Sequence, residues 1–170
     1  IHANFRYHGV QILLNANTEN LTVNGEKESL ILADGSILNA DMVVVSVGVA
    51  PENTLAKKVG LELGVKGAIK VNAKMETSVP DIYAVGDAVQ VKHFITEQDA
   101  VISLAGPANK QGRIAADNIC GKNSEYKGSQ GSSVIKLFDM TVAMTGINEQ
   151  QAKANGIEYE KVILTQNSHA

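Results

Sequence analysis

A single carboxylate at the end of an apolar run is the feature of this sequence best placed to do chemistry. Residues 82–85 read Ile-Tyr-Ala-Val, and Gly86 and Asp87 follow them directly. Such a run is typical of a buried strand, and Gly86 lets the backbone turn at its end. Ligands of open α/β sheets bind at the carboxyl ends of strands, where Asp87 would accept hydrogen bonds from ligand hydroxyl groups. Taken alone, however, these residues favour an ordinary acidic turn.

No nucleophile or metal-binding set accompanies this carboxylate in the sequence. The four histidines show no metal-ligand spacing, and the single cysteine, Cys120, follows a predicted helix end. A reactive cysteine favours a positively charged or helix-N-terminal setting, whereas Cys120 is predicted at the C-terminal end of a helix. There is no Gly-x-Ser-x-Gly elbow and no glycine-rich phosphate loop. We therefore expect no metal and no catalytic residue within the chain.

The composition bounds the fold and the partners. The chain has 170 residues, of which 44% are hydrophobic and 19% charged, so it suits one domain or parts of two, of α/β or α+β type. The formal net charge of −3, without a basic cluster, argues against nucleic acid as a partner. A lone cysteine excludes an internal disulfide framework and indicates a cytoplasmic protein. No apolar run has the length of a membrane span, so we expect no membrane partner.

Short strands and one hairpin are predicted for the first part of the chain. The strands are expected at residues 9–14, 20–23 and 28–32. Asp34-Gly35 is a strong hairpin signal and predicts a small antiparallel meander. Residues 40–48 form a β-branched run too apolar for a sheet with one wet face, which predicts a buried strand. A short helix at 55–59 and a strand at 69–71 are expected to follow.

A longer helix is predicted after the Gly-Asp turn. Pro107 in its first turn and Gly121 beyond its end bracket about three helical turns. Small residues recur on one face, at Ala105, Ala108, Gly112 and Ala115. Close packing on a sheet and contact with a flat cofactor explain this face equally well, and the helix N-terminus would favour partial negative charge nearby.

A Gly/Ser-rich stretch at residues 128–133 is the best internal boundary. Beyond it we predict strands at 133–138 and 141–145, a helix at 149–154 capped by Asn148, and a strand at 158–164. So few elements bury little apolar surface, so we interpret them as the beginning of an α+β domain.

The order of these motifs resembles the FAD-dependent pyridine nucleotide-disulfide oxidoreductases. The segments that carry the resemblance are residues 33–35, 40–53, 67–71 and 82–88. Residues 104–113, Leu-Ala-Gly-Pro-Ala-Asn-Lys-Gln-Gly-Arg, are similar to the branch that contains coenzyme A-disulfide reductases, NADH oxidases, NADH peroxidases and persulfide reductases. The resemblance covers essentially the whole chain.

The resemblance implies cofactor-binding roles for a small set of residues. They are Gly48, Gly86, Asp87, Ser103, Leu104 and Ala105. Asp87 matches the aspartate that accepts hydrogen bonds from the ribityl chain of FAD, and the stretch from Ser103 to Ala105 matches the segment beside the isoalloxazine ring. The helix that follows would point its positive end at the flavin, and Gly48 matches a position near the nicotinamide.

The same resemblance implies a domain organisation. Residues 1–45 would end the NAD(P)-binding domain, 46–125 would form the second segment of the FAD-binding domain, and 126–170 would begin a C-terminal dimerisation domain. The glycine-rich FAD and NAD fingerprints and the redox cysteine of the family would lie upstream of Ile1. We therefore expect the chain alone to have little or no affinity for FAD.

The implied parent is an enzyme that transfers hydride from NAD(P)H through FAD to a disulfide, a persulfide or oxygen, as a homodimer. One alternative is a ferredoxin or rubredoxin reductase, which uses no redox cysteine; a cysteine about one helix after the upstream FAD fingerprint would exclude it. Another is an interaction module that keeps the fold without the chemistry, and its own start codon before Ile1 would reveal it. The acceptor and the choice between NADH and NADPH are not fixed by these residues.

Overall fold

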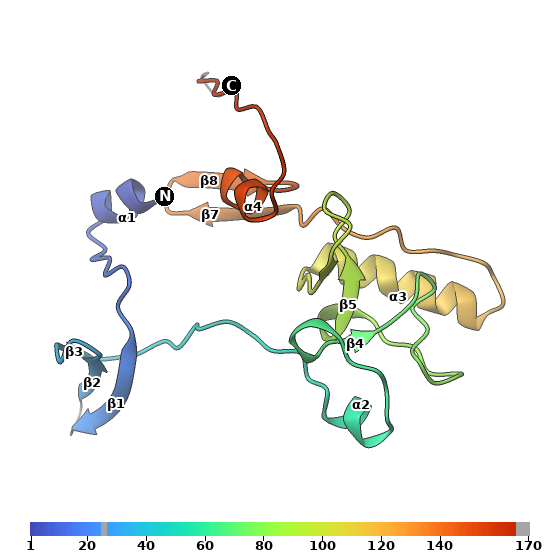
Figure 1. Cartoon of the computed structure of the whole chain (residues 1–170). Coiled ribbons are helices and arrows are strands. Elements are labelled where there is room, and N and C mark those ends of the chain that lie inside the picture. Colours follow the sequence, from blue (N-terminus) through green and yellow to red (C-terminus); the bar gives the residue numbers. More distant parts are fainter. Residues whose placement is uncertain (25–26, 166–170) are drawn as a thin grey trace. The chain divides into compact units, whose positions relative to one another are not determined.

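The computed structural model describes residues 1–24 and 27–165 (Figure 1). The chain divides into two compact units, each described here by itself. The first unit contains Ile1–Val49 and Ile135–Val142, and the second contains Ala50–Val134 and the chain from Ala143 onward. Both units mix short helices with small sheets, which confirms the expected combination of α/β and α+β elements.

A three-stranded antiparallel meander belongs to the first unit. Its strands are β1 (Thr18–Asn24), β2 (Lys27–Leu32) and β3 (Ile37–Ala40), in the order β1-β2-β3. The predicted hairpin is confirmed: Gly35 adopts φ +83° and its N–H donates to the Leu32 carbonyl at 2.9 Å. The Asp34 carboxylate accepts the Ser36 N–H at 2.9 Å, which fixes the turn between β2 and β3.

A short helix, α1 (His2–Tyr7), stands near the start of the first unit, where the sequence predicted none. Side chains of α1 and of its C-cap His8 contact Phe138 and Asp139, at the tip of the hairpin formed by residues 133–144. Phe5 meets the Phe138 ring edge-on, His8 stacks on that ring with centroids 4.1 Å apart, and Asn4 Nδ2 donates to Asp139 Oδ1 at 3.0 Å. The strand predicted at residues 9–14 is absent, because no strand of the described chain pairs with it.

The prediction of a buried strand at residues 40–48 is also wrong. Only Ala40 belongs to a strand, and the following residues are irregular and, apart from the half-buried Val43, exposed, with Val44 79% and Val47 91% accessible. A buried parallel strand requires neighbouring strands on both sides, and no sheet of the described residues extends to this segment.

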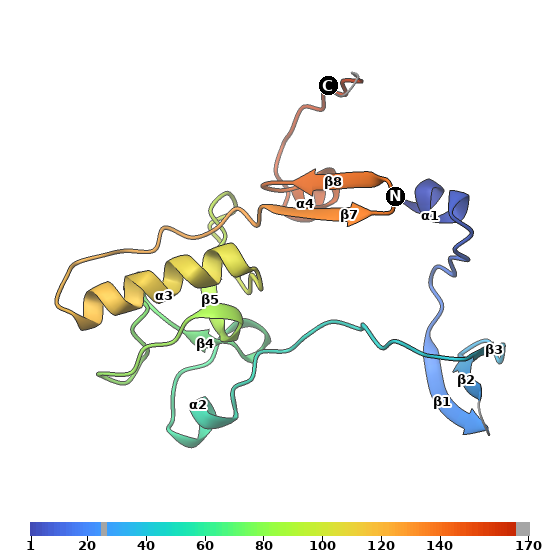
Figure 2. The same cartoon turned by 180° about the vertical axis from the view of Figure 1, so that it is seen from behind.

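The second unit is organised around a small mixed sheet and one long helix. Strand β4 (Ile69–Lys70) pairs in parallel with β5 (Val89–Lys92), and β5 pairs in antiparallel with β6 (Asp99–Ala100). The predicted helices are confirmed as α2 (Thr54–Lys58) and α3 (Ala105–Ile119). In both views α3 lies beside β5 (Figure 2).

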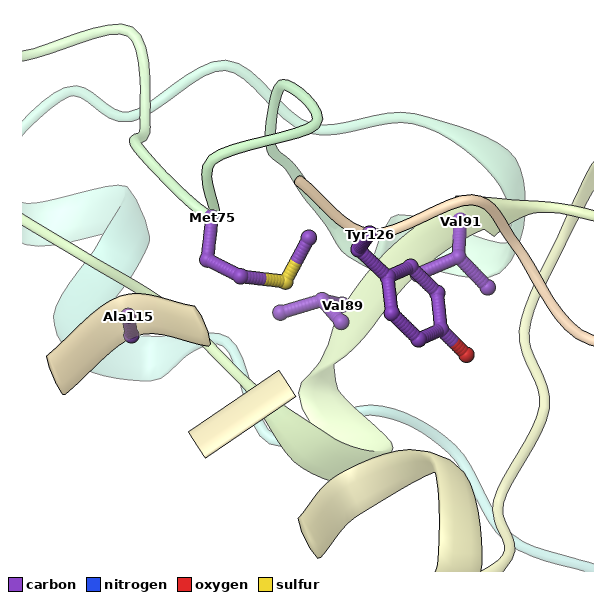
Figure 3. Close-up of a cluster of buried hydrophobic side chains, with 5 residues drawn as sticks. All are labelled: Met75, Val89, Val91, Ala115 and Tyr126. Atoms are coloured by element: carbon purple, nitrogen blue, oxygen red, sulfur yellow. The ribbon is translucent and has the colours of Figure 1, made fainter. Parts of the chain in front are cut away.

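The core of the second unit lies between α3 and this sheet. It contains Met75, Val89, Val91, Ala115 and Tyr126, each at most 9% exposed (Figure 3). Residues 82–85, expected as a strand, form only one bridge, between Glu76 and Tyr83. They pack onto the core instead, with Tyr83 and Ala84 half-buried against it.

The C-terminal part contains a hairpin and one helix. Strands β7 (Ser133–Leu137) and β8 (Met140–Met144) form a two-stranded sheet. Helix α4 (Glu149–Ala154) follows, and the predicted Asn148 cap is present as a capping box with Gln151. The strand predicted at 158–164 is absent, because no other strand lies beside it in the described part.

Candidate functional site

The predicted Gly-Asp turn is a single turn of 3₁₀-helix, η2 (Gly86–Ala88). Val85 before it is extended, and Gly86 reverses the chain with φ +80°, a conformation that strains any side chain. Asp87 is exposed, and its carboxylate makes no hydrogen bond or ion pair within residues 1–24 and 27–165. The turn therefore presents a carboxylate whose acceptor positions are open to a ligand.

A buried glutamine fixes this turn to helix α3. Gln111 is 1% exposed, and its Oε1 accepts the Gly86 N–H at 2.7 Å. The same stretch of α3 brings Ala108 near Gly86, where an added Cβ would lie 3.9 Å from the Ala108 Cβ. Because a buried amide oxygen needs a donor, this bond holds the backbone of the turn at one place on the helix.

Sequence reasoning missed Gln111, although a signal for it exists. Gln111 lies three residues after Ala108 and four before Ala115, and so falls on the face of α3 that the small residues mark as buried. A polar side chain on such a face needs a specific partner. That partner is the Gly86 N–H, 25 residues away in the sequence, and the sequence alone does not identify it.

The N-terminus of α3 supplies the second part of the site. The N-cap Leu104 is extended and gives no side-chain cap, and the first turn contains no acidic residue. The first N–H groups of a helix lack intrahelical acceptors and carry partial positive charge. Ser103 and Ala105 beside it are exposed, so these donors are open to a ligand.

The structure brings most of the predicted site residues into one unit. Gly86, Asp87, Ser103, Leu104 and Ala105 all belong to the second unit, where η2 packs on α3. Gly48 belongs to the first unit, in an exposed stretch with φ +102°. Its role stays a prediction, as do the cofactor roles of the others.

The single cysteine lies at the opposite end of α3 from the predicted flavin contacts. Cys120 is exposed at the C-cap of α3. Over the described residues, no three His, Cys, Asp or Glu side chains gather closely enough to hold a metal ion. None of the helices described is both long and apolar enough to cross a bilayer. Asp87 and the N-terminus of α3 belong to the same unit, and a carboxylate acceptor together with helix-terminal donors suits a polyhydroxylated, partly anionic ligand.

The model of one protein family matches residues 1–112 of the chain, and its description is pyridine nucleotide-disulphide oxidoreductase. The NAD(P)H sulfur oxidoreductase (CoA-dependent) of Pyrococcus furiosus is 35% identical over 168 residues, which are 98% of this chain and 36% of that protein. The coenzyme A disulfide reductase of Staphylococcus aureus is 33% identical over 155 residues, 91% of this chain and 34% of its own length. The chain thus spans about a third of these relatives.

Solved structures resemble the chain closely. Reduced CoADR-RHD of Bacillus anthracis is 48% identical with a TM-score of 0.87, over 94% of this chain and 28% of that one. The NAD-dependent persulfide reductase of A. fulgidus is 36% identical with a TM-score of 0.87, over 92% of this chain and 29% of that one.

Proposed function

Because the chain belongs to the pyridine nucleotide-disulphide oxidoreductase family, we propose that it contributes one wall of the flavin site of an NAD(P)H-dependent oxidoreductase. That enzyme transfers hydride from NAD(P)H through FAD to a disulfide or persulfide of the coenzyme A type, or to oxygen. The names of the similar proteins support this range of acceptors, since they include a coenzyme A disulfide reductase, a persulfide reductase and an NADH oxidase.

One observation carries the proposal. The Asp87 carboxylate, which has no partner among the described residues, stands on a turn that Gln111 holds to α3 by a 2.7 Å hydrogen bond. The N-terminus of the same helix, which has no side-chain cap, lies in the same unit. The residues present therefore fit FAD, which has a polyol chain for the carboxylate and a ring that gains negative charge.

Each side chain has a defined task in this proposal. Bound FAD would supply the two-electron chemistry. Asp87 accepts hydrogen bonds from the ribityl hydroxyls, and Gly86, which has no side chain, leaves room for the ribityl chain to approach. Residues 103–105 lie along the isoalloxazine, and the α3 N-terminus stabilises negative charge on its pyrimidine edge when the ring is reduced. Gly48 lies on the nicotinamide side.

The domain roles and the assembly belong to the same proposal. Residues 1–45 end the NAD(P)-binding domain, 46–125 belong to the FAD-binding domain, and 126–170 begin the dimerisation domain, although 166–170 lie outside the described residues. Apolar side chains that remain exposed in this last range support a partner surface, with Val134 71%, Val162 80% and Leu164 82% accessible. We expect a cytoplasmic homodimer.

Equilibrium dialysis of the chain against FAD tests the flavin assignment. We expect weak binding, because one wall makes only part of the contacts, and Asp87→Asn should weaken it by about tenfold through loss of charge-assisted hydrogen bonds. Glu125→Gln is the matched control, since Glu125 is exposed and its replacement removes the same charge. Equal affinity for both variants, or tight stoichiometric binding by the chain alone, would contradict the proposal.

A further inference from the structure

The second unit contains a cavity that the flavin assignment does not use. It has a volume of about 480 Å³ and lies among the first turn of α3, Phe94 and the segment from Tyr126 to Ser132. The size falls within the range of small-molecule sites, which is about 300–1,000 Å³. The predicted flavin contacts at Asp87 and residues 103–105 are not among its lining residues.

The charge of the cavity is one-sided. Lys110 and Lys127 line it, and no Asp or Glu does. Neither lysine joins an ion pair among residues 1–24 and 27–165, in contrast to Lys92 and Lys122, which pair with Asp99 and Asp117. Two lysines that line one cavity without a carboxylate among its lining residues attract an anion.

A backbone donor adds to this charge. Gly106, in the first turn of α3, lines the cavity and has a backbone N–H, whereas Pro107 beside it has none; α3 is 15 residues long without a side-chain cap or an acidic first turn. The partial positive charge of the helix N-terminus is therefore not neutralised by the helix itself.

An independent observation comes from Tyr126. Its side chain lines the cavity and is only 9% exposed, yet its buried hydroxyl has no hydrogen-bond partner among the described residues. In Figure 3 the hydroxyl end of the ring points away from Met75 and Ala115. A buried hydroxyl without a partner is costly, and an acceptor seated in the cavity would satisfy it.

We propose that this cavity, between α3 and residues 126–132, binds the phosphate or pyrophosphate group of a small molecule. Lys110 and Lys127 supply the charge, the Gly106 N–H supplies a backbone donor, and the Tyr126 hydroxyl supplies one more. The ligand is distinct from the flavin, and the site does not depend on the flavin assignment being correct.

Calorimetric titration of the chain with inorganic pyrophosphate at low ionic strength tests the site. Lys110→Ala/Lys127→Ala should weaken binding by at least about tenfold, because two charged contacts are lost. Lys57→Ala/Lys58→Ala is the control, since it removes the same charge from α2 and should change the affinity by less than about twofold. Equal weakening in both variants would show general charge attraction and overturn the proposal, as would the absence of binding to the unmodified chain.

Two further measurements test the Tyr126 contact and the independence of the cavity from the flavin. Tyr126→Phe should weaken pyrophosphate binding about threefold without lowering the melting temperature, because the hydroxyl has no partner to lose. Titration in the presence of excess riboflavin, which has the ring and the polyol chain of FAD but no phosphate, should leave pyrophosphate affinity unchanged. Loss of pyrophosphate binding under riboflavin would assign the cavity to the flavin and overturn a separate site, whereas failure of riboflavin binding alone would leave this result intact.

Discussion

The core around Val89 and the stretch from Met42 to Val49 are both rich in valine, but their side chains lie in opposite environments. Val89 is 1% exposed and packs between the small sheet and α3, whereas Val47 is 91% exposed. Apolar sequence alone does not bury a segment; it needs partner segments that cover it. For Val89 these partners come from Met75, Ala115 and Tyr126, while no strand of the described residues pairs with the second stretch.

Two glycines provide the sharpest contrast between these regions. Gly128 and Gly48 both have positive φ, of +89° and +102°, but an added Cβ at Gly128 would lie 2.5 Å from the Lys92 carbonyl oxygen, and one at Gly48 would meet nothing within 4 Å. Gly128→Ala should destabilise the chain by about 3 kcal/mol, from backbone strain plus the clash. Gly48→Ala should cost about 1 kcal/mol. Urea denaturation measures both, and equal costs would contradict the packing at Gly128.

The next largest effect on stability is expected from replacing a valine by alanine in each of the two regions. Val89→Ala should lower the free energy of unfolding by about 2 kcal/mol, through lost burial and a small cavity. Val47→Ala should change it by less than about 0.5 kcal/mol, because Val47 has little burial to lose. A cost at Val47 as large as at Val89 would show that its stretch is packed in solution.

Replacement of Gln111 tests how the turn is held. Gln111→Met keeps the volume but removes the acceptor of the Gly86 N–H, which should cost about 1–2 kcal/mol and speed hydrogen exchange of that amide. Gln150→Met is the control, since Gln150 is exposed in α4. Unchanged exchange at Gly86 would show that Gln111 does not hold the turn.

The smallest effect concerns pH and α4. Hydrogen bonds from Lys153, then Tyr159 and Lys161, lower the pKa of Glu149 to about 2. A lowered folded-state pKa means that the stabilisation is present above the ordinary value of 4.5 and is lost as pH falls toward 2. Between these values, NMR should show residues 159–161 losing contact with α4. Glu149→Gln should abolish this pH response and Glu158→Gln should retain it; a response that persists in Glu149→Gln would assign it to another group.

Local signals predicted much of the fold. The Asp34-Gly35 hairpin, the Asn148 cap and the helix opened around Pro107 each depend on residues adjacent in sequence, and each is present. The strands that were predicted but are absent fall on segments whose structure depends on distant partners, namely residues 9–14, 40–48, 82–85 and 158–164. A run of apolar residues indicates that a segment favours burial, but it does not show which other segment covers it.

The candidate site follows the same division. The positions of Gly86 and Asp87 came from local pattern, since a turn after an apolar run is a short-range feature. Gln111 and the unpaired Tyr126 hydroxyl came only from the structure, because their neighbours in space are remote in sequence.

The flavin-binding wall is tested most directly by an amide NMR titration of the chain with millimolar FAD. We expect chemical-shift changes at Gly86, Asp87, Leu104 and Ala105, and their loss in Asp87→Asn with the fold retained. Changes confined to other parts of the chain, or the same changes in Asp87→Asn, would contradict the assignment of η2 and the α3 N-terminus as a flavin-binding wall.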